Sequence, residues 1–276
     1  MAFQPGAGLD RLATTPISRV PFTSARFFER ERDLWRDAGL LLGRESDLPA
    51  AGDYISFDLK VTGHALAVVR GRDGALRGFH NVCPHRGGRL FRDPRGNMAS
   101  IVCRFHGWAF GLDGSLRSLP EPQLFPGLPD KAELGLHPIA VDTWGGFVFA
   151  SPDPEPSVGL ADYLAGLPPM LEPYLREPPW QWYTGYQHRF RANWKDLMNI
   201  QHEGYHASHL HRQTLGVTFA PRDCSNTVFP DSPGVCSLLS VLRPEMEQDP
   251  PARMSKGQPL AMRHGTTSNW VDQDTS

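Results

Sequence analysis

Two cysteine–histidine pairs are the first residues in this sequence whose types and spacing could do chemistry. They lie in the segments 83–86 (CPHR) and 103–108 (CRFHGW). Thiolates and imidazoles bind both zinc and iron–sulfur clusters. Each segment contributes one ligand of each type, so both thiolates can converge on one iron and both imidazoles on another. The pattern favours a [2Fe–2S] cluster held by Cys83, His85, Cys103 and His106.

A structural zinc site is the alternative for these four residues. Zinc fingers usually take their cysteines from one half of the motif and their histidines from the other. Here each half mixes the two types. Neutral imidazoles lower the charge of the reduced cluster, so its potential lies above that of an all-cysteine ferredoxin. His80 precedes the first segment outside this spacing, and we expect it to be packed or exposed.

A second histidine group lies in the segment 193–211, NWKDLMNIQHEGYHASHLH. Asn199, Glu203 and His206 are spaced by four and then three residues, so on a helix they share one face. His206 and His211 would be about 140° apart on a regular helix. They can meet on one metal only if the helix loosens or ends between them, which leaves a site open on one side. A histidine-rich, solvated helix end is the alternative.

The elements that position these groups follow from the hydrophobic pattern. Residues 8–44 are predicted to be largely helical, ending at Gly43. Strands are expected in DYISFDLK, in both halves of HALAVVRGRDGALRGF and in GGFVFASP, with a further hairpin at Asp113-Gly114. No internal repeat is evident. Residues 45–155 therefore form a small all-β domain.

The remaining chain, residues 156–276, has a mixed pattern. A Pro-rich run at 151–157 suits a linker, and LADYLAGLPPMLEPYL suits a helix that proline interrupts. WQWYTGYQHRFRA has strand character, Asn193 begins a second helical stretch, and GVCSLLSVLRP carries weak strand signals. Residues 1–44 are expected to pack on this third part. The predicted fold class is α+β.

Composition excludes several classes of function. The 276 residues carry a formal net charge of −2, with 40% hydrophobic and 21% charged residues, which is typical of a soluble globular protein. No basic block favours a nucleic-acid partner. The start of the chain lacks the apolar region of a secretory signal, and no stretch approaches the roughly 18 apolar residues of a membrane span. We expect a cytoplasmic protein without a disulfide framework.

These segments resemble a known family. C-x-H-R-G and C-x-x-H-G-W are similar to the cluster loops of Rieske proteins. N-W-K followed by N-x-x-x-E-x-Y-H-x-x-x-x-H resembles the catalytic segment of Rieske non-haem iron aromatic ring-hydroxylating oxygenases, in the large (alpha) subunit. The resemblance implies an all-β Rieske [2Fe–2S] domain at 45–155 and a helix-grip catalytic domain at 156–276, in which an antiparallel sheet wraps around a helix.

The resemblance also implies a mononuclear Fe(II) held by two histidines and a distant aspartate. By position, His206 and His211 become ligands, and Asp274 matches the third, with Asp272 next. The stretch from His211 to Asp274 is shorter than in the family and the following helix is missing. The sequence is therefore a truncated fragment, or Asp274 is an ordinary tail residue. His202 and His209 match no ligand position.

Glu203 matches the carboxylate that links the cluster of one subunit to the iron of its neighbour in this family. Many relatives have Asp there, whereas carnitine-type oxygenases share Glu. A purely structural salt bridge is the alternative for Glu203. Asn199 matches a position near the iron.

The function implied is that of the terminal oxygenase of a ring-hydroxylating or demethylating mono- or dioxygenase. It would use O2 and electrons relayed from NAD(P)H by a reductase, with or without a ferredoxin, and would assemble as a homotrimer. The substrate would be an aromatic or quaternary ammonium compound. Aromatic residues at alternating spacing could line its pocket but are more typical of sheet core: Trp180, Trp182, Tyr183 and Tyr186.

Two alternatives remain from other classes of function. An electron-transfer Rieske protein without substrate chemistry would leave His206 and His211 idle and would need no third iron. A zinc-binding interaction module would hold no iron at all.

Overall fold

The computed structural model describes most of the first 164 residues and shorter segments after them. Residues Phe28–Tyr163 form one compact unit, and the described residues before Phe28 and from 189 onward belong to another. The described ranges are 16–37, 39–127, 130–164, 189–201, 205–213, 224–228 and 236–240.

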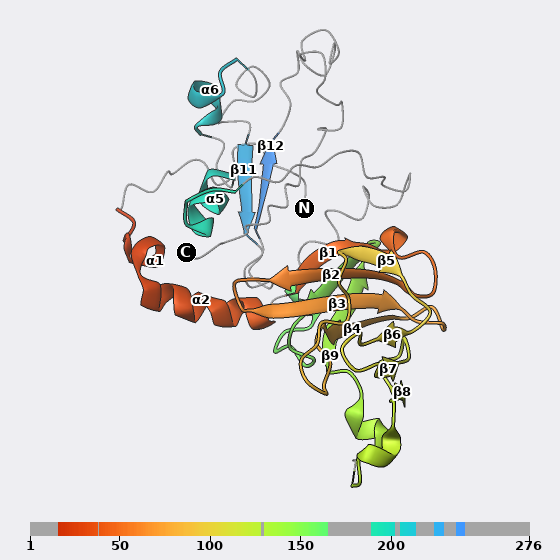
Figure 1. Ribbon diagram of the computed structural model, residues 1–276. Helices are drawn as coiled ribbons and strands as arrows, with labels where there is room; N and C mark the ends of the chain where they lie inside the picture. Colours follow the sequence, from red (N-terminus) through yellow and green to blue (C-terminus); the bar gives the residue numbers. More distant parts are fainter. Residues whose placement is uncertain are drawn as a thin grey trace. The chain divides into compact units, whose positions relative to one another are not determined.

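The first unit is built on a seven-stranded sheet, in which every neighbouring pair of strands is antiparallel (Figure 1). Its strand order is β1-β10-β9-β4-β3-β2-β5. The strands are β1 (Leu40–Arg44), β2 (Asp53–Leu59), β3 (His64–Arg70), β4 (Leu76–His80), β5 (Arg95–Asn97), β9 (Pro138–Trp144) and β10 (Phe147–Ser151). A separate three-stranded sheet contains β6 (Ile101–Val102), β7 (Ala109–Phe110) and β8 (Leu116–Ser118).

Strand β3 contributes to two hydrophobic cores because successive side chains of a strand point to opposite faces. Leu66 and Val68 belong to one core, and Ala67 and Val69 belong to the other. All four side chains are fully buried. The second core also contains Cys83, Cys103, Trp108 and Phe110 from the cluster loops and β7. The sheet therefore supports the cluster loops directly.

Most of the expected strands are confirmed, but the helix predicted through Gly43 is wrong for Leu40–Arg44. Helix α1 spans Val20–Thr23 and α2 spans Ala25–Asp37, after which the chain becomes strand β1. Leu40 pairs with Ala150 of β10. A short apolar run fits either a helix or a strand, and the hydrogen bonds to this distant strand decide the outcome. Residues 8–15 lie outside the described part of the chain.

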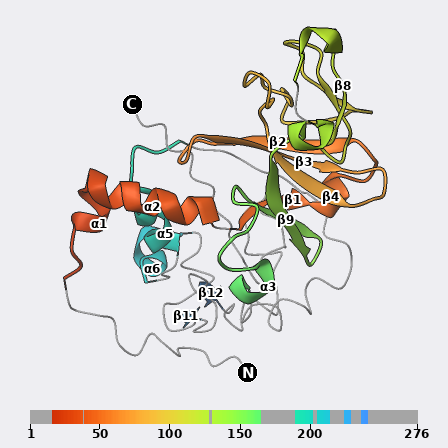
Figure 2. The ribbon, with the colours of Figure 1, turned by 90° about the horizontal axis from the view of Figure 1, so that it is seen from below.

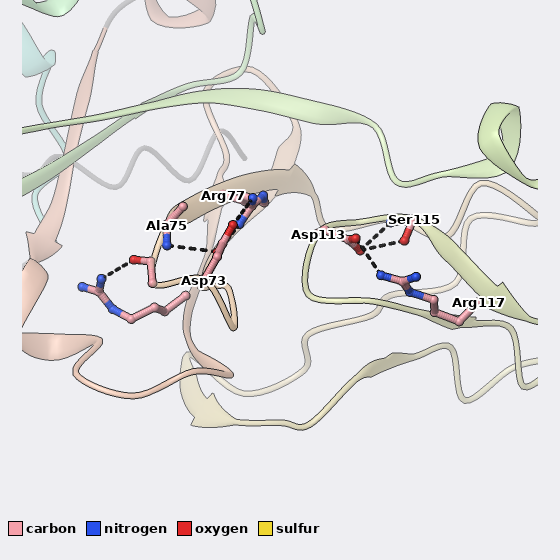
Figure 3. A network of polar contacts seen from close by, with 8 residues as sticks. Asp73, Ala75, Arg77, Asp113, Ser115 and Arg117 are labelled. Atoms are coloured by element: carbon pink, nitrogen blue, oxygen red, sulfur yellow. Dashed lines mark hydrogen bonds and ion pairs between the residues drawn. The ribbon is translucent and has the colours of Figure 1, made fainter.

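Two hairpin turns share a short sequence repeat, contrary to the expectation of none. Residues 71–77 (GRDGALR) and 111–117 (GLDGSLR) each begin with a glycine amide that donates to the carbonyl four residues on, at 2.8 and 2.9 Å. Figure 3 shows the equivalent ion pairs, Asp73–Arg77 at 2.6 Å and Asp113–Arg117 at 2.7 Å. Hydrogen bonds to the arginine and the turn amide lower the pKa of Asp73 below its usual value.

The first turn lies in the β3–β4 hairpin, before the first cluster loop, and the second lies in the β7–β8 hairpin, after the second loop. The two hairpins contact one another at these turns. Gly114 lies against the ring of Phe79 so closely that a Cβ there would lie 2.4 Å from a ring carbon. The pKa of the Arg77 guanidinium is raised mainly by its hydrogen bond to Asp73. The charge of the Asp113 carboxylate, in the other turn, raises it further. The paired turns therefore fix the two loops relative to one another.

Short helical elements complete the first unit. Three 3-10 turns lie in loops, and helix α3 follows the last strand of the sheet. Helix α2, which Figure 2 shows from below, is attached by its carbonyl at Arg36, which accepts from the Ser151 hydroxyl at 3.0 Å. The bounds are Glu45–Asp47 (η1), Pro122–Leu124 (η2), Lys131–Leu134 (η3) and Leu160–Tyr163 (α3).

The second unit contains α1, α5 (Trp194–Gln201), α6 (Ala207–Leu210) and the antiparallel pair β11 (Cys224–Val228) and β12 (Cys236–Ser240). The helix expected from Asn193 is confirmed, since the Asn193 side chain accepts from the amide of Lys195 at 3.0 Å. Helices together with antiparallel sheets confirm the α+β class. Among the described residues, no helix is long and apolar enough to cross a membrane.

Replacing Asn81 by alanine should destabilise the first unit strongly. Its buried side chain accepts from the amides of Leu90 and Phe91 at 3.0 and 2.8 Å and donates to the Phe91 carbonyl at 2.7 Å. Asn81→Ala leaves these three groups unpaired, and we expect the free energy of unfolding to fall by about 2–4 kcal/mol in chemical denaturation. The exposed Asn97, substituted in the same way, should cost under about 1 kcal/mol; equal losses would contradict this account.

Candidate metal centres

The two cluster loops have the same backbone geometry. In the first, the Gly87 amide donates to the Cys83 carbonyl at 2.9 Å and the Cys83 amide donates to Gly88 at 2.8 Å. In the second, Gly107 donates to Cys103 at 2.9 Å and Cys103 to Trp108 at 2.8 Å. Gly87 and Gly107 have φ of 72° and 73°, a left-handed conformation that favours glycine. Both loops therefore present a cysteine and a histidine in the same way.

The two cysteines form a buried pair of free thiols. Cys83 and Cys103 are each 2% exposed and form no disulfide. Burial raises the pKa of Cys83, and the neighbouring Cys103 raises it further, while the backbone amide of His85 opposes this. Gly88 also approaches the pair, since a Cβ there would lie 3.1 Å from the Cys103 sulfur. The loops therefore come close enough for both thiolates to reach one metal atom.

The two histidines lie beside the thiols and face one another. The ring centroids of His85 and His106 are 4.6 Å apart, and His85 stacks on Trp108 at 4.7 Å with an interplanar angle of 2°. Burial lowers the pKa of His85, and the charges of His106 and Arg86 lower it further, which favours the neutral imidazole that metals bind. Its Nδ1 is buried and has no hydrogen-bond partner among the described residues.

An unpartnered, buried imidazole nitrogen is costly unless something outside the protein chain satisfies it. The nitrogen lies beside a second imidazole and a pair of thiols, which is the donor set of a cluster with two sulfur and two nitrogen ligands. The residues present therefore fit a [2Fe–2S] group. His80 is not part of this set, as expected: its ring packs against His64, with centroids 5.4 Å apart.

The predicted histidines of the second centre also lie close together. The ring centroids of His206 and His211 are 5.3 Å apart, with an interplanar angle of 73°. His206 precedes the single-turn helix α6, and His211 follows it. The helix ends between them, as their spacing requires. Two imidazole ligands would fill only part of a metal ion's coordination sphere, which leaves positions for other ligands.

Asn199 and His206 do not share the uninterrupted helix that their spacing suggested. Helix α5 ends at Gln201, and Tyr205 and His206 form a turn. Asn199 is exposed. Glu203 and Asp274 lie outside the described residues, as do His202, Asp272 and the aromatic residues 180–186. Among the described residues, no group of three or more His, Cys, Asp or Glu side chains is arranged to hold one metal ion.

Contacts that the sequence did not indicate attach helix α5 to the N-terminal helices. The Asn193 side chain donates to the carbonyl of Phe22 at 3.1 Å. The Lys195 ammonium lies over the rings of Phe22 and Phe27, each at 5.7 Å, and of Trp194 at 5.1 Å. Such cation–π contacts contribute about 0.5–2 kcal/mol. The N-W-K motif therefore anchors the helix that precedes the histidine pair.

Comparison with known proteins finds related sequences and structures. Residues 39–129 match the Rieske [2Fe-2S] domain family. The chain is 34% identical over 202 residues to the glycine betaine monooxygenase oxygenase subunit of Pseudomonas aeruginosa, covering 70% of this chain and 44% of that protein. It is also 34% identical over 194 residues to the large oxygenase component of the naphthalene 1,2-dioxygenase system of Pseudomonas aeruginosa, covering 68% of this chain and 42% of that protein.

The chain contains a Rieske [2Fe–2S] domain and is similar to the large subunits of Rieske oxygenases. Its structure superposes on the quaternary ammonium Rieske monooxygenase CntA with a TM-score of 0.72 and 26% identity, covering 82% of this chain and 62% of that one. The chain spans about half the length of the curated relatives it matches. The family match identifies its first cofactor as a Rieske [2Fe–2S] cluster.

The two equivalent glycines of the Rieske loops should differ in their tolerance of alanine. Either substitution forces a left-handed alanine, at a cost of about 1–2 kcal/mol. At Gly107 the new Cβ would also lie 3.0 Å from the ring of Pro120, whereas at Gly87 its nearest neighbour is 4.0 Å away. We expect Gly107→Ala to lose its visible cluster absorption at a lower temperature than Gly87→Ala. If both variants lost the cluster absorption at the same temperature, the ring of Pro120 would have to move aside at little energetic cost.

Proposed function

We propose that this chain is the oxygenase component of a Rieske-type mono- or dioxygenase. The observation that carries the proposal is the presence of two separate histidine pairs, one beside buried thiols and one around a helix end. The division into residues 1–44, 45–155 and 156–276 is part of it, with β1 of the first segment joining the Rieske sheet.

Within this proposal the four loop ligands hold the cluster, and His206, His211 and Asp274 hold the iron. When bound, the cluster transfers single electrons, and a ferrous ion with three open positions supplies the site where O2 is reduced beside the substrate. The burial of Cys83 and Cys103 keeps water from the thiolates. Trp108 covers one face of the His85 imidazole and holds its orientation.

The proposed electron route crosses between subunits. Glu203 would accept hydrogen bonds from a ligand histidine of each centre, one in its own subunit and one in a neighbour, and Asn199 would lie near the iron. This requires an oligomer, and we propose a homotrimer. Electrons would come from NAD(P)H through a reductase, with or without a ferredoxin.

The substrate class that we propose first is a quaternary ammonium compound. The names of two relatives, the glycine betaine monooxygenase subunit and the quaternary ammonium Rieske monooxygenase CntA, support it. Glu203 supports it further, because carnitine-type oxygenases share this residue. An aromatic substrate is the second candidate, since the naphthalene dioxygenase component is equally identical to this chain.

An O2-uptake assay with reductant separates these substrate classes. We expect trimethylammonium compounds to stimulate O2 uptake with release of a demethylated or cleaved product, because a cationic substrate needs different contacts from an apolar ring. Neutral tert-butyl analogues of the same shape are the matched control and should stimulate it far less. Stimulation by aromatic acids alone would favour the second class.

Replacing His206 by alanine tests the division into two centres. We expect the iron content to fall from about three to about two atoms per chain, because one ligand of the mononuclear site is lost while the cluster is untouched. The Rieske visible and electron paramagnetic resonance spectra should persist, and substrate-dependent O2 uptake should stop.

His209→Ala is the matched control, because His209 is exposed on the same single-turn helix. It should keep the third iron and the activity. Loss of the Rieske spectrum in His206→Ala would contradict two separate centres. A wild-type chain with only two irons would favour an electron-transfer protein without substrate chemistry.

A further inference from the structure

The aspartate of each repeated turn is followed by glycine, as Asp73-Gly74 and Asp113-Gly114. Asp-Gly is the aspartyl sequence most prone to isomerisation, because glycine places no side chain between its amide nitrogen and the neighbouring carboxyl group. The nitrogen forms a bond to Cγ of the aspartate, one water leaves, and a succinimide ring results. Water then opens the ring at either carbonyl. One product is aspartate, and the other is isoaspartate, in which the main chain runs through the former side chain.

Hydrogen bonds to the carboxylates restrain this reaction in both turns (Figure 3). Arg77 donates to both oxygens of Asp73, at 2.6 and 2.8 Å, and Arg117 donates to one oxygen of Asp113 at 2.7 Å. The attack on Cγ needs the neutral acid, because the hydroxyl of that form leaves as water. The hydrogen bond from Arg77 holds the pKa of Asp73 below its usual value, and one from the Ser115 hydroxyl lowers the pKa of Asp113. Both aspartates are therefore kept largely in the unreactive, charged form.

The two turns differ in how tightly the rest of the domain holds them. Asp73 and Gly74 are exposed, and a Cβ built at Gly74 would meet nothing within 4 Å. Gly114 is buried, and a Cβ there would lie 2.4 Å from a ring carbon of Phe79. The Gly114 carbonyl also accepts from the amide of Leu136 at 2.8 Å. The first turn can therefore open without disturbing the core, whereas the second cannot.

The exposed turn is also separated from the cluster. Strand β4 lies between Asp73 and the first cluster loop. Its five residues span roughly 16 Å at the usual rise of a strand. A neighbouring subunit that contacts a cluster histidine therefore need not cover this turn.

We propose that Asp73 is a modification site, at which the folded protein forms isoaspartate spontaneously at a rate that Arg77 restrains, while Asp113 in the equivalent turn is protected. The reaction consumes one water and releases one, and it needs no enzyme or cofactor. The extra main-chain carbon would move the carboxylate away from Arg77. The Asp73–Arg77 ion pair would then be lost from one of the two paired turns.

Ageing the folded, cluster-loaded full chain at physiological temperature and neutral pH tests this. After proteolytic digestion the two turns lie in separate peptides, and chromatography with electron-based fragmentation distinguishes isoaspartate from aspartate in each. We expect isoaspartate to form at least about tenfold faster at Asp73 than at Asp113, because exposed turns open far more readily than buried ones. In a chain unfolded by urea the two sites should react at similar rates, which controls for the local sequence.

Replacing the two arginines separates the effect of the ion pair from that of burial. Arg77→Gln should speed isoaspartate formation at Asp73 about two- to fivefold, the amount that loss of an exposed ion pair allows. Arg117→Gln is the matched control, and Asp113 should remain slow in it because Gly114 is still buried. Asp73→Glu should abolish the signal from the first turn, because the larger ring that glutamate requires forms much more slowly.

Two results would overturn the proposal. In the first, isoaspartate forms as fast at Asp113 as at Asp73 in the folded chain. In the second, neither site reacts in the folded wild type or in Arg77→Gln over a period in which the unfolded chain accumulates isoaspartate at both. An unchanged rate at Asp73 in Arg77→Gln would show that the ion pair does not restrain the reaction.

Discussion

The structure depends on one constraint: two separate loops must each present a thiol and an imidazole to the same small group. Both loops meet it in the same way, by turning the amide of Gly87 or Gly107 back onto the carbonyl of the preceding cysteine. A side chain at either glycine would oppose that backbone conformation. The paired turns shown in Figure 3 then fix one loop relative to the other, because they join the hairpins on either side of the ligands.

The features that the sequence predicts well are those set by neighbouring residues. The spacing of cysteine and histidine, the Asp113-Gly114 turn and the strand signals of β2 and β3 are all local, and the structure contains each of them. Strand β1 could not be predicted in this way, because its partner β10 lies about a hundred residues farther along the chain. A local stretch of sequence does not include that partner. The repeat of residues 71–77 at 111–117 is visible in the sequence but becomes meaningful only as paired turns, and the stacking of Trp108 on His85 needs the folded sheet.

The two centres differ in how much of each a local segment can build. A single turn of helix brings His206 and His211 together, so this pair was predictable from spacing once the helix was allowed to end. The third ligand must come from a distant segment, and no periodicity specifies which one, so Asp274 and the bridging role of Glu203 remain proposals. The attachment of Lys195 to the rings of Phe22 and Phe27 could not be foreseen either, because it joins segments far apart in the chain.

The place of Cys83 and Cys103 within the hydrophobic core has a consequence for the protein in a living cell. Both sulfurs belong to the same buried set as Trp108 and Phe110, so the inorganic group that they bind completes the interior of the domain. Ligand binding of this kind adds directly to folding free energy. A shortage of iron would then remove the polypeptide itself through proteolysis, and the amount of protein in the cell would follow the supply of the metal.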